Sequence, residues 1–248
     1  MNGAEGGGDR AGSALGRVAL ITGATGALGR VVAARFAADG WRLGLVGTDE
    51  ERLRSMAADL ELDDERWSPA TGDLADAAAA RAAVEAIERR FGAVDAVIHL
   101  VGGWAGGKPI TATDPGDVGS MLDQHVRTTH HVVAAAVPGM VERGWGRVLA
   151  VTTPYATEPG ATSGGYAIGK AGQEIVLRML AREVAGTGVT ANMVVVKTID
   201  TKHERESAPT AKNAGWTTPE EIAATFRYLA SDEAATINGA RIPLFGRG

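Results

Sequence analysis

Two residues that can exchange protons, Tyr166 and Lys170, stand four positions apart in the sequence. In a helix this spacing puts both side chains on one face, about one turn from each other. An ammonium within a few ångströms favours the phenolate, so Lys170 is expected to lower the pKa of Tyr166 from its ordinary value of about 10. Tyr166 would then act as a general acid or base near neutral pH. A surface tyrosine beside a surface lysine has the same spacing, so the surrounding elements must decide between the two interpretations.

The elements around this pair alternate between strands and helices. Apolar periodicity predicts a helix over residues 163–185 and, upstream of it, a strand over residues 147–152. Further strands are predicted at residues 18–22, 42–46, 67–71, 93–101, 189–196 and 241–245. Further helices are predicted at residues 28–38, 50–60, 75–91, 117–143 and 219–230. This alternation predicts an α/β fold, in which a doubly wound parallel sheet of about seven strands carries helices on both faces.

The domain organisation follows from length and composition. At 248 residues the chain has the length of a single α/β domain, and no internal repeat or linker divides it. Residues 1–15 are rich in glycine, alanine and polar residues, which cannot bury enough apolar surface to become ordered. We therefore expect a disordered N-terminal tail at residues 1–15, followed by one domain at residues 16–248.

Composition also excludes several classes of partner. The net charge of -5 argues against nucleic acid. The chain has no cysteine, and its five histidines form neither a His-x-x-x-His nor a His-Glu-x-x-His pattern, so we expect no metal site. The N-terminus has no apolar stretch long enough for a signal peptide or a membrane span. This predicts a cytoplasmic protein with no membrane partner.

The first predicted strand and the first predicted helix are joined by a glycine-rich turn with the sequence TGATGALG at residues 22–29. Glycines let backbone N–H groups approach a pyrophosphate closely, and the following helix N-terminus adds a positive dipole. The position of the turn predicts a dinucleotide site, with an ordinary tight turn as the alternative.

These features, in this order, resemble the short-chain dehydrogenase/reductase family over residues 17–246. The similarity extends to the runs at residues 73–74, 192–194, 199–201, 218–223, 229–232 and 237–239. The resemblance implies a Rossmann-like fold and a nicotinamide cofactor. It implies that the cofactor is contacted by Gly23, Thr25, Gly26, Ala27, Leu28, Gly29, Thr48, Asp73, Leu74, Val101, Gly102, Gly103, Tyr166, Lys170, Val196, Thr198, Ile199 and Thr201.

The same resemblance implies four catalytic residues. Tyr166 would be the proton donor, and Lys170 would lower its pKa and hold the nicotinamide ribose. Thr153 stands thirteen positions before Tyr166, where the family usually has a serine that orients the substrate oxygen. His125 stands where the family usually has an asparagine that relays to the lysine through water. A packed, hydrogen-bonded imidazole is the alternative for His125. The strand that usually ends Asn-Asn-Ala-Gly here ends with residues 99–102, HLVG, and Val196-Lys197 replaces the usual Pro-Gly.

The choice between NAD(H) and NADP(H) depends on the end of the second strand. NAD enzymes usually have Asp or Glu near Gly47, and NADP enzymes usually have Arg near Thr48. This chain has neither. The missing carboxylate and the Thr48 hydroxyl, with Arg52 and Arg54 nearby, favour NADP(H), whereas the acidic residues at 49–51 favour NAD(H). We expect NADP(H) to be preferred.

The loop at residues 101–107 indicates the kind of substrate. Its sequence, VGGWAGG, is similar to the corresponding loop of dihydropteridine reductases, a branch of the same family, as are residues 198–201 and 216–219. The Trp104 indole would stack on a flat conjugated substrate. The alternative is that Trp104 only packs against its own loop. The expected substrate contacts are Trp104, Thr153, Tyr155 and Trp216, beneath a mobile lid at residues 198–216.

Together these residues imply an NAD(P)H-dependent oxidoreductase that reduces a carbonyl or a conjugated C=N of a small, flat molecule. Two alternatives use the same fold: a redox-neutral cyclase or dehydratase, and a non-catalytic nucleotide-binding sensor. In this family the helix at residues 163–185 and its predecessor usually build a dimer, and the last helix and strand a tetramer. We therefore expect a homodimer or a homotetramer.

Overall fold

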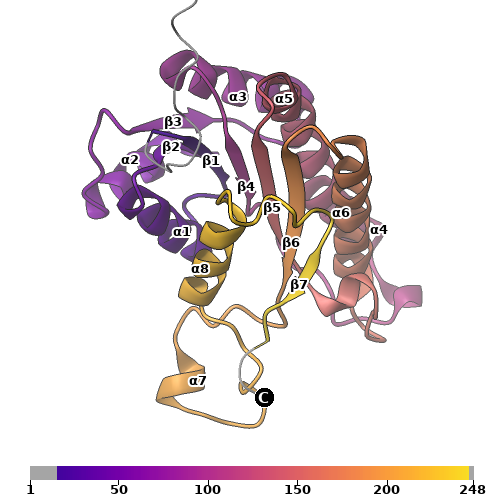
Figure 1. Ribbon diagram of the computed structural model, residues 1–248. Coiled ribbons are helices and arrows are strands. Elements are labelled where there is room, and N and C mark those ends of the chain that lie inside the picture. Colours follow the sequence, from indigo (N-terminus) through magenta and orange to yellow (C-terminus); the bar gives the residue numbers. More distant parts are fainter. Residues whose placement is uncertain (1–15, 246–248) are drawn as a thin grey trace, which may run out of the picture.

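The computed structural model describes residues 16–245, in which seven strands form one sheet in the order β3-β2-β1-β4-β5-β6-β7 (Figure 1). Every adjacent pair is parallel. The strands are β1 (Val18–Thr22), β2 (Arg42–Gly47), β3 (Trp67–Thr71), β4 (Ala96–His99), β5 (Gly146–Thr152), β6 (Val189–Val195) and β7 (Arg241–Pro243). The predicted doubly wound parallel sheet is confirmed. The tail predicted at residues 1–15 lies outside the described residues.

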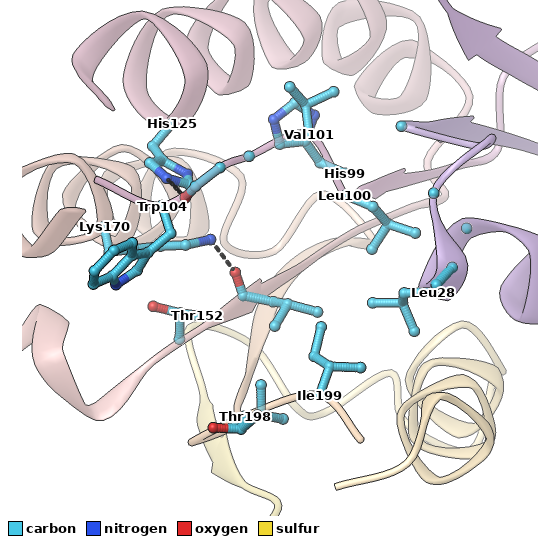
Figure 2. A pocket seen from close by; sticks show the side chains of 18 of the residues that line it. Leu28, His99, Leu100, Val101, Trp104, His125, Thr152, Lys170, Thr198 and Ile199 are labelled. Atoms are coloured by element: carbon cyan, nitrogen blue, oxygen red, sulfur yellow. Dashed lines mark hydrogen bonds between the residues drawn. The ribbon is translucent and has the colours of Figure 1, made fainter. Parts of the chain in front are cut away.

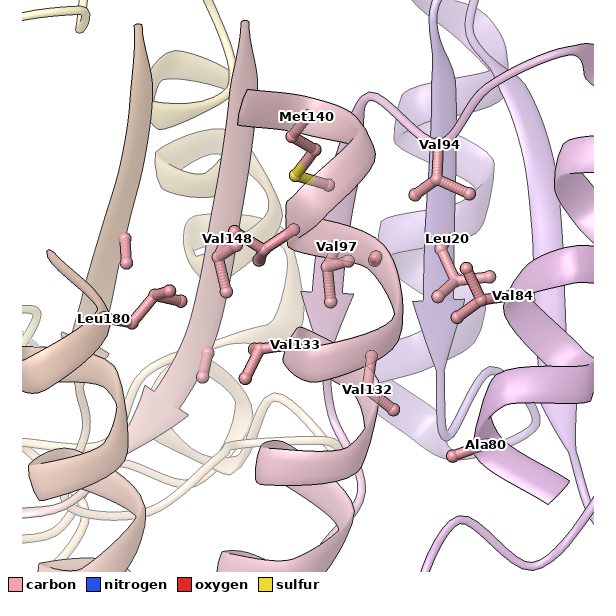
Figure 3. Packing of buried hydrophobic residues seen from close by; sticks show 14 of the residues in the cluster. Leu20, Ala80, Val84, Val94, Val97, Val132, Val133, Met140, Val148 and Leu180 are labelled. Atoms are coloured by element: carbon pink, nitrogen blue, oxygen red, sulfur yellow. The ribbon is translucent and has the colours of Figure 1, made fainter. Parts of the chain in front are cut away.

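Helices cover both faces of the sheet and bury two separate apolar clusters. One face packs against α3 (Ala77–Phe91), α5 (Thr128–Glu142) and α6 (Gly164–Glu183). Figure 3 shows this cluster, where valines of the strands meet side chains of α3, α5 and α6. The other face packs against α1 (Ala27–Ala38), α2 (Glu50–Asp59) and α8 (Pro219–Leu229). Because both faces are covered, the central strands β1 and β6 are buried along their whole length rather than at alternate residues.

The predicted third strand contains Pro69, which has no N–H for a sheet hydrogen bond. The structure resolves this conflict by putting β3 at the edge of the sheet, where it pairs only with β2, in a register that sets Leu45 beside Pro69.

The single helix predicted at residues 117–143 is divided in the structure. It begins as α4 (Pro115–Leu122), capped by the Asp114 side chain, which accepts a hydrogen bond from the Gly116 amide. A π-helical turn, η2 (Asp123–Arg127), follows and leads directly into α5. Side-chain hydroxyls bond to carbonyls of this turn: Thr128 Oγ1 donates to Gln124 O at 2.6 Å, and Thr129 Oγ1 donates to His125 O at 2.6 Å. Such turns are frequent at functional sites.

The segment between β6 and α8 extends beyond the carboxyl ends of the strands and carries the short helix α7 (Glu204–Ser207) (Figure 1). Asp200 accepts hydrogen bonds from the Glu204 and Arg205 amides at 2.8 and 2.9 Å, which begins α7. Arg205 forms a bidentate ion pair with Glu221 at 2.7 and 3.0 Å. This ion pair joins α7 to α8. Two short 3-10 turns, η1 (Ile110–Ala112) and η3 (Pro154–Ala156), complete the described elements.

Candidate functional site

A cavity of about 450 Å³ opens at the carboxyl ends of β1, β4, β5 and β6, where the strand order reverses between β1 and β4. In open α/β sheets this reversal is the place where ligands bind. Figure 2 shows the cavity, with Trp104 at its edge and Leu28, Lys170 and Ile199 around it. Its walls are formed by Gly23, Gly26, Ala27, Leu28, Gly29, His99, Leu100, Val101, Gly102, Gly103, Trp104, His125, Val151, Thr152, Tyr166, Lys170, Val196, Lys197, Thr198, Ile199 and Thr201.

The three glycines of the turn after β1 differ in how far the surrounding protein would tolerate a side chain. Gly23 has φ +66°, and a Cβ there would lie 3.0 Å from the Leu100 carbonyl. A Cβ on Gly29 would lie 2.4 Å from the Ala24 carbonyl oxygen, so close packing of the turn on α1 requires this glycine. A Cβ on Gly26 would meet only the Gly23 carbonyl oxygen, at 3.3 Å. Protein packing therefore explains Gly23 and Gly29, whereas Gly26 is exposed and opens onto the cavity.

Gly26 is also the N-cap of α1, and no side chain caps this helix terminus or places an acid in its first turn. The first N–H groups of a helix attract anions, and the dipole adds to that attraction. The turn and the terminus together fit the pyrophosphate of a dinucleotide.

Lys170 is buried beneath this cavity, with 7% of its surface exposed. Its ammonium donates to the Val151 carbonyl at 2.8 Å and to Gln173 Oε1 at 2.9 Å (Figure 2 shows the first bond). An ammonium has three N–H donors, so these two bonds leave one for a ligand. Burial lowers the pKa of Lys170 to about 8, and the charge of Glu174 acts in the opposite direction.

Tyr166 lies in the first turn of α6 and lines the cavity. Burial raises the pKa of Tyr166 above its ordinary value, while the hydrogen bond with Thr153 lowers it and the nearby Tyr155 raises it. The expectation that Lys170 lowers this pKa is therefore wrong for this structure. The physical reason is that Lys170 is directed at Val151 and Gln173, and that burial disfavours the phenolate. Tyr166 consequently holds its proton at neutral pH.

His125 lies on the π-helical turn and is 1% exposed. Its Nε2 donates to the Gly103 carbonyl at 3.0 Å, and its ring meets Tyr166 edge-on at 5.6 Å. Because Nε2 carries the proton, Nδ1 holds a lone pair, and this atom is buried without a hydrogen-bond partner. Burial, together with the charge of Lys170, lowers the pKa of His125 to about 3. His125 is thus a neutral, hydrogen-bonded imidazole whose Nδ1 could still accept from a ligand.

A second buried imidazole, His99, ends β4 and was not among the residues expected in the site. Its Nδ1 lies 2.9 Å from Thr22 Oγ1, and its Nε2 lies 3.1 Å from Thr128 Oγ1. Burial lowers the pKa of His99 to about 3, and the charges of Lys170 and His125 add to this effect. His99 therefore links β1, β4 and α5 as a neutral hydrogen-bonding group.

The structure brings most of the sequence-predicted residues to the cavity. Several expected residues do not line it: Thr25, Thr48, Asp73, Leu74, Thr153, Tyr155 and Trp216. Tyr155 instead lines a neighbouring apolar cavity between η1, η3 and α6. The Trp216 carbonyl accepts a hydrogen bond from Arg205 on the segment before α8. Sequence reasoning missed His99, Leu100, Val151, Thr152 and Lys197, although each ends or follows a parallel strand, which is the signal that could have found them.

The end of β2, where cofactor choice was expected to be set, lies on the same edge of the sheet. Thr48 is exposed directly after β2, and a Cβ on Gly47 would contact only the Leu53 side chain, at 3.4 Å or more. Arg54 is paired with Glu50 at 2.6 Å, so part of its charge is already compensated on the surface of α2.

Two other classes of function find no support in the described residues. Within residues 16–245, no group of three His, Asp or Glu side chains gathers as a metal site would require. No helix in that part of the chain is both long and apolar enough to cross a membrane.

Comparisons with known proteins agree with this geometry. Residues 17–212 match the short chain dehydrogenase family. The chain is 32% identical over 238 residues to the BbsC subunit of a hydroxy(phenyl)methyl-succinyl-CoA dehydrogenase from Thauera aromatica, covering 93% of this chain and 94% of that protein. It is 30% identical to D-threitol dehydrogenase from Mycolicibacterium smegmatis, covering 93% and 92% of the two chains. The crystal structure of levodione reductase superimposes with a TM-score of 0.85 at 25% identity, covering 94% and 97%.

Proposed function

Because this chain belongs to the short-chain dehydrogenase family, we propose that it reduces a carbonyl or a conjugated C=N of a small, flat molecule, with Tyr166 as the proton donor. The observation that carries the proposal is that Tyr166 and the buried Lys170 together line the cavity at the point where the strand order reverses.

The cofactor of this reaction is NAD(H) or NADP(H), as the family implies, and in reduced form it supplies a hydride. The residues that line the cavity fit such a cofactor. Gly26 and the uncapped terminus of α1 would receive the pyrophosphate, and the third N–H of Lys170 would reach the nicotinamide ribose. We propose a preference for NADP(H), supported by the absence of a carboxylate at Gly47 and by the exposed hydroxyl of Thr48.

The chain's own residues account for the proton. A reduction develops negative charge on the acceptor atom, and Tyr166, whose raised pKa keeps it protonated, donates to that atom. Thr153, hydrogen-bonded to the phenol, orients both the acceptor and the donor. The Lys170 ammonium, held by Val151 and Gln173, would use its remaining N–H to position the nicotinamide ribose beside this donor.

Trp104 supports a flat substrate. Its side chain is 64% exposed, it forms part of the cavity wall, and the indole offers a face on which a conjugated ring can stack. A quinonoid dihydropterin, the substrate suggested by the resemblance of residues 101–107 to dihydropteridine reductases, is one such molecule. A β-ketoacyl thioester or a cyclic ketone would use the same acid and a different part of the cavity.

The proposed assembly is a homodimer or a homotetramer. Apolar side chains are exposed on the outer surface of α5 and α6, notably Val141, Ile168, Ile175 and Met179. Large exposed apolar side chains gathered on neighbouring helices are unfavourable in a monomer and favour association. Light scattering after size-exclusion chromatography would give the molecular mass of the assembly.

The decisive experiment is stopped-flow measurement of nicotinamide absorbance with each of three substrates: a quinonoid dihydropterin, an acetoacetyl thioester and a cyclic diketone. Loss of reduced nicotinamide with any of them, in a stoichiometric single turnover, supports the oxidoreductase. A bound cofactor that stays unoxidised while the substrate is rearranged would identify the redox-neutral enzyme. Cofactor binding with no chemistry on a wider set of carbonyl compounds would identify the nucleotide sensor.

A further inference from the structure

A carboxylate is buried one helical turn after Lys170. Glu174 lies on α6 and is only 2% exposed. Its four-residue spacing from Lys170 puts both side chains on the same face of that helix. Burying a charged group is costly unless the surrounding atoms compensate it, so the partners of Glu174 need an explanation.

The two oxygens of Glu174 have separate partners on two different strands. Thr152 Oγ1 donates to Oε1 at 2.8 Å, and Thr152 lines the cavity at the end of β5. Arg241 Nε lies 2.8 Å from Oε2 and belongs to β7, the last strand of the sheet. The carboxylate therefore accepts a hydrogen bond from β5 and forms an ion pair with β7, in which Arg241 Nε makes no hydrogen bond.

The immediate hydrogen-bond partners of Lys170 carry no charge. The ammonium donates to the Val151 carbonyl and to Gln173 Oε1, and Gln173 Nε2 in turn donates to Thr129 Oγ1 at 3.0 Å. These bonds set the position of the nitrogen but supply no counter-charge.

Several titratable groups line the cavity with Lys170, act on its charge or pair with Glu174. They are His99 on β4, His125 on η2, Tyr166 and Glu174 on α6, Arg241 on β7, and the exposed Lys197 after β6. Both histidines are neutral, since burial has moved their pKa values to about 3. Among these groups Glu174 is the one carboxylate, and its charge opposes the effect of burial on the pKa of Lys170.

We propose that Glu174 is a positioning residue that keeps the buried Lys170 in its ammonium form, with Thr152 and Arg241 holding the carboxylate in place. The proposal rests on the proposed function and deepens it, because the ammonium is the form that would donate to the nicotinamide ribose. An ion pair that only attaches β7 to α6 is the competing explanation. That explanation predicts a change in melting temperature and no change in the titration of Lys170.

The test is a titration of Lys170 in the cofactor-free protein. The ¹³Cε signal of Lys170, assigned by its loss in Lys170→Met, is followed by NMR from pH 6 to pH 11. The Glu174→Gln variant keeps the side-chain shape and an oxygen that accepts the hydrogen bond from Thr152, but it removes the negative charge. We expect the titration midpoint of Lys170 to fall by about one unit or more from the wild-type value near 8. The pH at which NADPH affinity is lost, measured by calorimetry, should fall with it.

Matched variants separate this effect from others. Glu183→Gln removes an exposed carboxylate from the last turn of the same helix and should leave the midpoint unchanged. Glu174→Asp keeps the charge and should restore most of the shift. If Glu174→Gln does not fold, the double variant Glu174→Met with Arg241→Met replaces the ion pair by apolar groups, which buried sites often tolerate. The same fall in midpoint is expected there.

A midpoint within 0.3 unit of wild type in a folded variant lacking the carboxylate would overturn the proposal, as would an equal shift in Glu183→Gln. Because the titration needs neither cofactor nor substrate, this failure is distinguishable from failure of the proposed reduction, which would appear as a lack of turnover in an otherwise normal titration.

Discussion

The Lys170 ammonium donates to the Val151 carbonyl at 2.8 Å, which ties the middle of α6 to the end of β5. The bond anchors the nitrogen beneath the cavity rather than leaving it on the surface. With the pKa of Lys170 lowered to about 8 and that of Tyr166 raised, the lysine is the first of the two to lose its proton as the pH rises.

Tyr166→Phe should abolish proton donation while the fold and cofactor affinity are retained. Turnover in reduction should fall roughly a hundredfold or more, the usual scale for loss of a general acid. Lys170→Met should also reduce turnover, and the double variant should lose little beyond the worse single variant, because the two groups act as a unit. Steady-state rates with the true substrate check this. The control is Tyr228→Phe, an exposed tyrosine on α8. Turnover of Tyr166→Phe within threefold of wild type would contradict its role as the acid.

The rate of reduction should fall as the pH rises through about 8, because Lys170 then loses the ammonium form that would hold the nicotinamide ribose. Tyr166 contributes no limb in this range, since its raised pKa keeps it protonated. In Lys170→Met the remaining activity should show no limb near pH 8. A pH profile of kcat/KM for both proteins measures this difference. If Lys170→Met shows the same fall in rate near pH 8, a group other than Lys170 causes it.

Gly26→Val should weaken binding of both NADPH and NADH by roughly tenfold or more, because its side chain would enter the path of the pyrophosphate. Gly26 suits this test better than Gly23, where the positive φ and the contact with the Leu100 carbonyl would also disturb the fold. Gly119→Val is the control, since a Cβ there meets no atom within 4 Å. Calorimetry on variants with unchanged melting curves gives the affinities. Wild-type affinity in a folded Gly26→Val protein would remove the glycine turn from the binding site.

Gly47→Asp should shift the preference from NADP(H) toward NAD(H), because a carboxylate bonds the ribose 2′-OH and repels a 2′-phosphate. The fold tolerates the change, since the new Cβ makes only an ordinary contact with Leu53. The measurement is the ratio of the two dissociation constants in wild type and variant, with Gly47→Asn as the uncharged control. Tenfold tighter binding of NADH by the unmodified protein would show that the expected preference is reversed.

Trp104→Ala should raise KM for a flat conjugated substrate about fivefold or more, while cofactor affinity stays nearly unchanged. Trp104→Phe keeps an aromatic face and should recover most of the loss. An aliphatic ketone, which cannot stack, should respond little to either change. Equal kinetics for flat and aliphatic substrates in Trp104→Ala would mean that this indole only packs its own loop.

His99→Asn should make the protein less sensitive to acid. The folded chain keeps His99 neutral down to about pH 3, whereas the unfolded chain protonates it below about 6.5, so the unfolded state binds more protons in this window. Stability is therefore lost as the pH falls from 6.5 toward 3, at up to about 1.4 kcal/mol per pH unit for this group. Urea denaturation at several pH values should show a shallower slope in His99→Asn. His130→Asn, an exposed control on α5, should keep the wild-type slope.

Local sequence patterns were enough to predict the order of strands and helices along the chain, the parallel sheet, the glycine turn and the shared helix face of Tyr166 and Lys170. These are local properties: apolar periodicity reflects which face of an element is buried, and a four-residue spacing fixes a shared helix face whatever the helix packs against. The prediction of an unbroken helix at residues 117–143 missed the π-helical turn, because its sequence, DQHVR, contains no proline or glycine that would mark an interruption.

The electrostatics of the site could not be predicted from the sequence, because they depend on contacts between different elements. The pKa of Tyr166 rises rather than falls, because desolvation depends on everything packed around the phenol and not on the residue four positions away. The partners of Glu174, Thr152 on β5 and Arg241 on β7, come from strands that are far from it in the sequence and meet only when the sheet is assembled. Trp216 lies outside the cavity for the same reason, since α7 and the Arg205–Glu221 ion pair fix its segment against α8. Spacing along the chain specifies neighbours within one element, whereas burial and charge are set by neighbours across elements.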